Sequence, residues 1–448
     1  MKNKKKSIIV TGAAVMLAAA MALGGGTYAY LQGTTKDVVN NFNTNKVLVT
    51  LEEKTGSNYN IIPGTEQAKD PKVTVDNTVD SYVYAIVTDN TNGLVKYDIA
   101  DGWTLLNGWD GEHTKVYYRE VTKDAAAKEF SVLAGDKVAY DAALENSDMV
   151  NPDGTLKDGL NLTFTAHAIQ KDGFASPEAA FETAYTTVDT STDLTTALQE
   201  GKTAVLTTDI ALDSAYLNAS GEVNIIGNGH KLTAPTNSPQ KDNNRIISIT
   251  NQTEPTTINI KDVDLVGPTT GAYTRGISVG QSKNVTINIE DSSLSASYYA
   301  FNFAFGNENV EINCKNTTIQ GWAAMNIHTP NMKATFENCT LIGLNDKGYN
   351  EDGWNDFATV VVDNADGNPS ATGASGGVFT FKDCRIEANQ TTGNKQYFMS
   401  IRAINTTVDV ENCTFFVNGE QIAATQEALS PYVSVYEEAL DSFQFTIH

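Results

Sequence analysis

The chain has 448 residues and carries 31 Lys and Arg against 54 Asp and Glu, which gives a formal net charge of −23. A surface this acidic repels phosphate backbones and anionic lipids, so we expect no nucleic-acid partner. Four Cys are too few for a disulfide scaffold, and none is spaced as in a zinc site, so stability must come from the burial of apolar side chains. A chain of this length is expected to form two domains rather than one.

The first 29 residues have the three parts of an export signal: a basic start, an apolar run over 8–23 and a small-x-small motif that ends at Ala29. The run has 16 residues, fewer than the roughly 20 that span a bilayer, which favours a cleaved signal over a permanent anchor. We predict cleavage between Ala29 and Tyr30. The leader carries four Lys and no acid, so the mature charge is −27. Membrane contact is expected only through the uncleaved signal, and the mature protein is expected to be secreted without a covalent anchor.

Residues 30–185 contain short runs rich in Val, Tyr, Ile and Thr, and turn residues separate them. The runs include "KVLVTLEE", "KVTVD", "SYVYAIVTD", "KVYYREV" and "LNLTFTAHAIQ". Pro-Gly, Asp-Gly and Asn-Gly pairs stand between them, and no βαβ rhythm occurs. This pattern predicts an antiparallel β-sandwich.

Three ordered motifs in residues 1–175 resemble the TasA/camelysin family of Gram-positive exported proteins. They are "GGTYAYLQGTTKDVVNNFNTNKVLVTLEE", "IIPGTEQAKDPKVTVDNTVDSYVYAIV" and "LTFTAHAIQKDGF". The resemblance implies a jelly-roll sandwich and a signal cut by a dedicated peptidase. It also implies the assembly of biofilm-matrix fibres, in which the freed N-terminal segment of one subunit completes the sheet of the next.

The same resemblance makes residues 30–51 the donated or self-inserted strand, with Tyr30, Val38, Val39 and Phe42 as its assembly residues. An apolar strand freed by proteolysis can add to an exposed sheet edge through main-chain hydrogen bonds. The alternative, that these residues form the first strand of their own sandwich, stays open. Proteolysis, described for some camelysin-like proteins, has little support here, because His113 in "GEHT" lacks the second His of a zinc motif and is interpreted as a solvated loop residue.

The pattern changes after residue 185. A linker is predicted at 186–192, and a short helix capped by Asp193 and ended by Gly201 is expected to cover the open end of the next domain, 193–448. That domain repeats a motif in which an apolar or Cys residue comes two before an Asp or Asn. The Asp or Asn positions, spaced by 29, 25, 22, 45 and 29 residues, are Asp262, Asp291, Asn316, Asn338, Asp383 and Asn412.

Steps of this length predict the coils of a parallel β-helix, with "VNIIGNGHKL" at 223–232 as the first coil. The Asp/Asn column fits a tight corner in the left-handed backbone region, where the side chains can form a ladder. Residues 190–448 resemble pectate-lyase-like right-handed parallel β-helix repeats, a scaffold that serves lyases, hydrolases and adhesins alike. Cys339, Cys384 and Cys413 share one repeat position, which favours packing inside the helix, although a disulfide between neighbouring coils stays open.

A long insertion at 343–378 carries most of the residues that suggest a ligand site. Tyr349 and Trp354 could stack on a sugar ring beside its acids, and Asp346, Asp352 and Asp356 are weak Ca²⁺ candidates in a sequence that predicts no metal site and no cofactor. The other interpretation of the insertion is an acidic surface loop.

Two further ligand candidates open equivalent strands in successive coils. These are Arg245 and Arg275, which could bind an anionic glycan or pair with nearby carboxylates, as could Arg402. His328 is interpreted as a core or rim residue of the β-helix. If the protein is an enzyme, Asp352, Asp356 and Arg275 are its candidate catalytic residues.

The sequence thus predicts an all-β protein with an N-terminal jelly-roll-like sandwich and a C-terminal right-handed parallel β-helix. We expect a structural or adhesive protein of the cell surface or biofilm-type extracellular matrix. Its expected partners are a dedicated signal peptidase, further copies of itself, and a glycan or surface protein. The alternative is a secreted polysaccharide lyase or glycoside hydrolase, and the residues favour a role without catalysis over this one.

Overall fold

The computed structural model describes residues 44–448, except for 57–58, 152–156, 158–159, 214, 236–243, 270–273, 345–356, 364–373 and 390–395. The predicted cleavage site and the assembly residues Tyr30, Val38, Val39 and Phe42 lie outside the described residues. Within the described ranges, no helix has the length and apolar character needed to cross a membrane.

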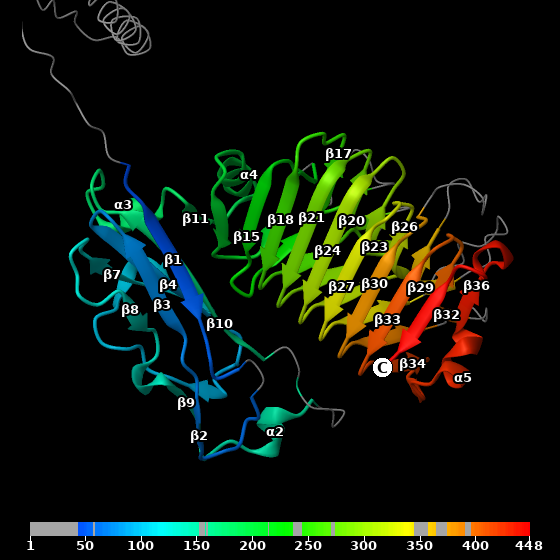
Figure 1. Cartoon of the computed structure of the whole chain (residues 1–448), viewed down its shortest axis with the longest axis horizontal. Helices are drawn as coiled ribbons and strands as arrows, with labels where there is room; N and C mark the ends of the chain where they lie inside the picture. Colours follow the sequence, from blue (N-terminus) through cyan, green and yellow to red (C-terminus); the bar gives the residue numbers. More distant parts are fainter. Residues whose placement is uncertain are drawn as a thin grey trace, which may run out of the picture. The chain divides into compact units, whose positions relative to one another are not determined.

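The first part of the described chain consists of short antiparallel strands (Figure 1). The strands are β1 (Val47–Glu52), β2 (Glu66–Ala68), β3 (Lys72–Asn77), β4 (Ser81–Asp89), β5 (Val95–Lys96), β6 (Thr104–Asp110), β7 (Thr114–Val121), β8 (Glu129–Ser131), β9 (Lys137–Tyr140) and β10 (Leu162–Gln170). Three short helices accompany them: η1 (Ala134–Asp136), α2 (Asn146–Met149) and α3 (Pro177–Phe181). The strand orders are β1-β3-β8, β10-β4-β7-β6 and β2-β9-β5, which confirms the prediction of antiparallel sheets.

Strand β4 is the centre of this part because it is buried on both faces. Its side chains alternate, so that Tyr82, Tyr84 and Ile86 belong to one apolar cluster, whereas Val83, Ala85 and Val87 belong to another. Helix α3 closes the first cluster by placing the fully buried ring of Phe181 4.8 Å from the ring of Tyr84.

From residue 185 the described strands pair in parallel and form three long sheets, each named here after one strand. The β18 sheet contains β11 (Tyr185–Val188), β12 (Thr203–Leu206), β15 (Glu222–Ile226), β18 (Thr256–Lys261), β21 (Lys283–Glu290), β24 (Glu308–Lys315), β27 (Lys333–Glu337), β30 (Val378–Lys382), β33 (Thr407–Glu411) and β37 (Gln444–Ile447). The β19 sheet contains β13 (Ile210–Ala211), β16 (Lys231–Thr233), β19 (Asp264–Val266), β22 (Ser293–Ser295), β25 (Thr318–Gly321), β28 (Thr340–Gly343), β31 (Arg385–Ala388) and β34 (Thr414–Val417), to which β35 (Glu420–Ile422) adds antiparallel.

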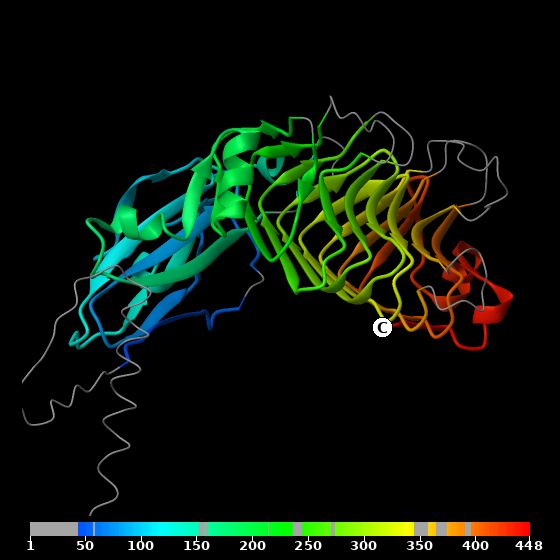
Figure 2. The same ribbon diagram turned by 90° about the horizontal axis from the view of Figure 1, so that it is seen from above.

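The β20 sheet contains β14 (Leu217–Asn218), β17 (Ile247–Thr250), β20 (Arg275–Gly280), β23 (Tyr299–Phe303), β26 (Ala323–Ile327), β29 (Phe357–Val362), β32 (Gln396–Ile401) and β36 (Val433–Val435). Three short helices near the C-terminus are α5 (Gln426–Leu429), η3 (Ser430–Tyr432) and η4 (Glu437–Ala439). One strand from each sheet makes one coil, and Figure 2 shows successive coils side by side. The predicted parallel β-helix is thereby confirmed, and the long step in the repeat spacing contains β29.

The start of the β-helix differs from its prediction in two details. The segment expected as a linker contains most of β11, the first strand of the β18 sheet. The helix α4 (Ser191–Gln199) begins two residues before Asp193, and its N-cap is Thr190, whose side chain accepts a hydrogen bond from the backbone N–H of Asp193. A threonine hydroxyl and an aspartate carboxylate can each accept a hydrogen bond from a free N–H group of the first helical turn. Because Thr190 and Asp193 are both present, the sequence alone did not decide which of them is the N-cap.

The corner between the β18 and β19 sheets carries the predicted ladder. All six predicted Asp and Asn residues have φ angles between 49° and 53°, the left-handed region that these side chains tolerate. The Nδ2 group of Asn316 donates to Oδ1 of Asp291 at 2.8 Å, and that of Asn338 donates to Oδ1 of Asn316 at 2.9 Å. Asn228, in the predicted first coil, has the same backbone geometry.

Inside the coils, equivalent side chains stack on one another. One buried column of the β18 sheet consists of Ile258, Ile287, Ile312, Ala334, Phe379 and Val408. Full burial of each large member contributes roughly 1.5–3 kcal/mol. The four Cys of the chain, including Cys339, Cys384 and Cys413, are free and buried, which confirms the packing interpretation for these three.

Loops and strand ends of the sandwich bind the first rungs of the corner ladder. Asn90 Nδ2 donates to Asp262 Oδ1 at 2.8 Å, and the backbone N–H groups of His113 and Thr114 donate to Asn228 Oδ1 at 3.2 and 2.5 Å. The ring of His113 lies 2.6 Å from Asn90 Oδ1 through its Nδ1. His113 lies in a loop, as expected, but it is only half-exposed and contacts Asn90 and Asn228. No local sequence signal marked the contact with Asn228, which is more than a hundred residues away.

Asp262 is the titratable group that this contact buries. Its side chain is 5% exposed, and among the described residues its Oδ2 atom has no hydrogen-bond partner. Burial raises the pKa of Asp262 to about 6, although the nearby His113 and the hydrogen bond from Asn90 each lower it. The folded protein therefore holds this proton more tightly than the unfolded chain, and the free energy of unfolding falls as pH rises from about 4 to about 6.

We predict that Asp262→Asn raises the free energy of unfolding at pH 7 by about 2 kcal/mol and flattens its decrease between pH 4 and 6. Asparagine fits the left-handed backbone and has the shape of the carboxylate, but it carries no charge to desolvate. Denaturant unfolding at several pH values measures the effect. The matched control is Asp383→Asn, at an exposed corner with the same φ of 53°; equal effects of the two substitutions would contradict the prediction.

Candidate functional site

The outer face of the β20 sheet gathers polar, aromatic and charged side chains. Along each strand the side chains alternate, so that Ile277 and Val279 enter the core, whereas Ser278 lies on the other face. The next rungs place Asn302 and Asn326 beside it. Asn302 Nδ2 donates to Ser278 Oγ at 3.2 Å, and Asn326 Nδ2 donates to Asn302 Oδ1 at 3.1 Å.

Arg245 and Arg275 lie at one border of this face, as the repeat predicts. The backbone N–H of Arg275 donates to the carbonyl of Asn244, which places the two Arg residues on adjacent coils. The guanidinium carbon of Arg245 lies 5.1 Å from the centre of the Tyr216 ring. Burial lowers the pKa of both guanidinium groups, and the neighbouring charge of Arg245 lowers that of Arg275 further. Two adjacent cations with little hydration favour a carboxylate or another anion near them.

The next rungs carry an aromatic cluster that the sequence interpretation missed. Tyr299 pairs with Arg275 in the sheet register. The ring of Tyr298 lies 3.9 Å from that of Tyr299 and is stacked on Trp322 at 5.2 Å, and the Tyr299 hydroxyl donates to the Tyr298 hydroxyl at 3.0 Å. Burial raises the pKa of Tyr299. The signal available in the sequence was "SYYAFNF" followed one coil later by "GWAAMNI", in which aromatic residues stand at or just before the start of the strand.

The opposite border of the face holds an ionic group made of His328, Asp363 and Arg402. These residues follow three successive strands and pair through backbone hydrogen bonds with the preceding coil. Arg402 Nη1 lies 3.3 Å from Asp363 Oδ1, and His328 Nε2 lies 3.8 Å from Asp363 Oδ2. Arg402 is 4% exposed and Asp363 is 8% exposed. The expected pairing of Arg402 with a carboxylate is confirmed, and His328, expected at the core or rim, lies beside that carboxylate.

The remaining sequence candidates lie outside the described residues: Asp346, Tyr349, Asp352, Trp354 and Asp356. Among the described residues, no group of three His, Cys, Asp or Glu side chains could hold a metal ion. The described part of the face brings together aromatic rings, guanidinium groups and a hydrogen-bonding ladder. Arg245, Arg275 and Tyr299 are half-exposed, whereas Tyr298, Trp322, Asn302 and Asn326 are buried.

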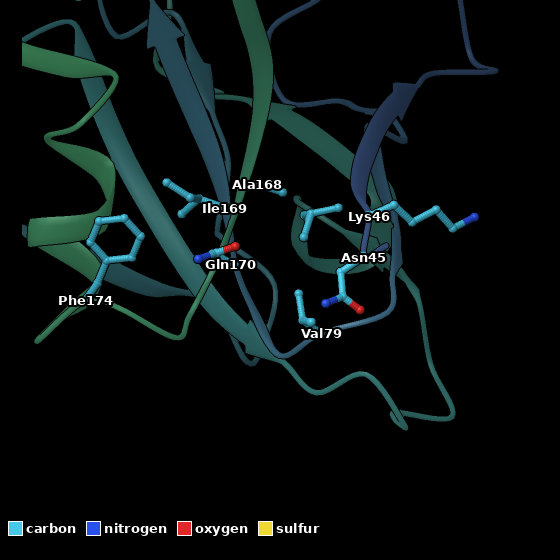
Figure 3. Close-up of a pocket in the computed structure, with 8 residues that line it drawn as sticks. Asn45, Lys46, Val79, Ala168, Ile169, Gln170 and Phe174 are labelled. Atoms are coloured by element: carbon cyan, nitrogen blue, oxygen red, sulfur yellow. The ribbon is translucent and has the colours of Figure 1, made fainter. Parts of the chain in front are cut away.

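A second candidate site is the edge of the sandwich. Strands β1 and β10 lie close together, and in the described structure each is paired on one side only. Val47, Val49 and Leu51 of β1 are half-buried, and β10 contains no fully buried residue. A cavity of about 310 Å³ lies at one end of these strands. Figure 3 shows its lining residues, with Asn45 and Lys46 opposite Ala168 to Gln170 and Phe174. An open edge of this kind can accept a further strand.

Comparisons with known proteins give little help with this site. No protein-family model matches the chain, and a search of curated proteins gives no match. Solved structures that match include catalytic domains of a GH87 alpha-1,3-glucanase, one in complex with nigerose and one in complex with tetrasaccharides. Both are 12% identical, cover 89% of this chain and 98% of their own, and have TM-scores of 0.19 and 0.14. At these TM-scores the likeness carries no inference about fold or activity.

We predict that Asp363→Ala lowers the free energy of unfolding by about 3 kcal/mol, because it removes a carboxylate from a buried guanidinium group. The double variant Asp363→Ala/Arg402→Met should recover at least half of the loss, since it also removes the positive charge. Thermal and denaturant unfolding of the three proteins measure both effects. Strictly additive losses in the double variant would show that the pair has no coupling.

Proposed function

We propose that the protein is an exported structural and adhesive component of a bacterial cell surface or extracellular matrix. In this proposal the sandwich assembles by strand addition and the β-helix contacts a glycan or a surface protein. The observation that carries it is the open edge at β1 and β10, of which β1 directly follows the segment expected to be freed by cleavage after Ala29.

The proposed occupant of the edge is residues 30–43 of a second copy. The segment places Val38, Val39 and Phe42 just before β1, and apolar side chains of this kind would cover the half-buried apolar side chains of β1 and β10. Its backbone would supply the hydrogen bonds that an open edge lacks. The predicted donated strand reached Leu51, but Val47–Glu52 pairs with β3 of its own sandwich, so the proposal is restricted to the part before β1.

The contact with a glycan is supported by the outer face of the β20 sheet. Its half-exposed side chains include Arg245, Arg275 and Tyr299, and paired guanidinium groups bind carboxylates. An acidic polysaccharide is therefore the ligand that the Arg245 and Arg275 border fits best. The mature protein is strongly acidic, so the ligand must approach this border rather than the remaining surface.

A secreted polysaccharide lyase or glycoside hydrolase is the second candidate function. The observation that favours it is the same face, which combines aromatic rings with His328, Asp363 and Arg402. Its candidate catalytic residues are Asp352, Asp356 and Arg275. Release of reducing ends or of unsaturated products from a polyuronate or neutral polysaccharide, abolished by Asp352→Ala, would establish this function in place of the adhesive one.

For the assembly, we predict that the mature protein, residues 30–448, forms fibres visible by electron microscopy and that removal of residues 30–43 abolishes them. Val39→Asp should lower the fibre yield at least ten-fold because it places a charge at the apolar contact. Asn40→Asp is the matched control, since it adds the same charge at a polar position and should leave the yield unchanged. Isolated monomers of the unmodified mature protein over a wide concentration range would refute the assembly.

A further inference from the structure

A groove runs over the outer face of the β18 sheet, on a different side of the coil from the Arg and Tyr face. Its cavity of about 480 Å³ extends across β12, β15, β18, β21, β24 and β27, of which the last five lie side by side in Figure 1. Four equivalent side chains line it: Asn224, Asn259, Asn288 and Asn313. These four residues are named here the amide row.

The amide row is a one-way hydrogen-bond ladder. The Nδ2 groups of Asn259, Asn288 and Asn313 donate to the Oδ1 atoms of the preceding members at 2.8, 2.8 and 3.1 Å. A carboxamide has two N–H donors and a carbonyl oxygen with two lone pairs. The ladder uses one of each at Asn259 and Asn288, so both retain a second donor and a second acceptor that the half-exposed side chain can present to a ligand.

The spacing of these groups selects an extended polymer. Adjacent rungs of a sheet lie roughly 4.8 Å apart, about the length of one equatorially linked pyranose. A chain that lies along the β-helix axis would therefore meet one amide with each sugar, and ring hydroxyls both donate and accept hydrogen bonds as the carboxamide requires.

The charges beside the amide row select an uncharged ligand. The neighbouring column alternates in sign from rung to rung, and Lys261 to Glu290 and Lys315 to Glu337 each lie 3.9 Å apart. Opposite charges cancel within this column, although the whole chain has a net charge of −23. On the other side of the amide row, Glu222 and Glu311 accept hydrogen bonds from Asn224 and Asn313. The groove therefore has no excess positive charge with which to attract a polyanion.

The backbone of this sheet argues against an added peptide strand. Its N–H and C=O groups are paired with the strands on either side along the rungs, and the groove lies on a face rather than an edge, so strand addition has no groups to use. The sandwich end of the groove is lined by Tyr185, whose ring is stacked on Phe181 at 4.3 Å and 4°. A fixed aromatic ring there can stack on a terminal sugar.

We infer that this groove binds an extended, uncharged polysaccharide of equatorially linked pyranoses, such as a β-1,4-glucan, with one sugar for each coil. The inference deepens the proposed adhesive function and rests on it, since it gives the glycan contact a second site and a ligand class. It is independent of the Arg245 and Arg275 border, which fits an acidic polysaccharide.

The test is calorimetric titration of the mature protein with cello-oligosaccharides of two to six sugars. Because each additional sugar reaches another amide, cellohexaose should bind at least ten-fold more tightly than cellobiose. The variant Asn259→Thr/Asn288→Thr should lower the affinity for cellohexaose at least ten-fold, and threonine already occupies this column at Thr335 and Thr380. The control Thr380→Ala, in the same column and outside the set of residues that line the groove, should leave the affinity unchanged.

Thermal unfolding checks that each variant is folded, and Asn313→Thr alone provides the same test if the double variant is unfolded. Three results would overturn the inference. They are an affinity that does not depend on the length of the oligosaccharide, no binding of cellohexaose at millimolar concentration, and binding of polygalacturonate that the Asn variants abolish. Failed cellohexaose binding by a protein that still forms fibres counts against this inference alone. Lost fibres with intact cellohexaose binding count against the proposed assembly alone.

Discussion

The pairing of each strand with its counterpart one coil later is the constraint on which the β-helix depends. Parallel in-register pairing places equivalent residues of successive coils directly above one another. The side chains within each column must therefore be able to pack against or hydrogen-bond one another. Apolar columns satisfy this by stacking, as from Ile258 to Phe379. Polar columns satisfy it by a repeated hydrogen bond, as in the amide row, or by alternating charge, as from Lys261 to Glu337. The same stacking that stabilises the coil therefore produces a regular outer surface.

This constraint explains which features the sequence could predict. The corner from Asp262 to Asn412 was predictable because a left-handed backbone position accepts few residue types and recurs in every coil. The amide row carries the same kind of signal, the second position of "INIKDVDL", "INIEDSSL" and "INCKNTTI", but its outward direction becomes clear only once the strands are in register. Tyr298 and Trp322 mark only two adjacent coils, so their signal was much weaker than that of the corner.

Contacts between distant segments could not be predicted from local patterns. Asn90 and Asp262 are separated by 172 residues, yet their hydrogen bond joins the sandwich to the corner ladder. The burial of Asp262 and the position of His113 both follow from that contact. In the same way, the pairing of Asp363 with Arg402 depends on β29 and β32 being neighbours, which the long step in the repeat obscures.

The two candidate glycan faces and the sandwich edge fit one account of the protein, in which assembly and ligand contact use separate surfaces. The central claim is that the outer columns of the coil present hydrogen-bonding groups at the spacing of successive sugars in an extended polysaccharide. Its most direct test is a crystal structure of the mature protein with cellohexaose. The account predicts sugar rings along the groove, one above each coil, with hydroxyls bonded to Asn259 and Asn288. A sugar chain that crosses the strands out of register, or that binds elsewhere, would contradict it.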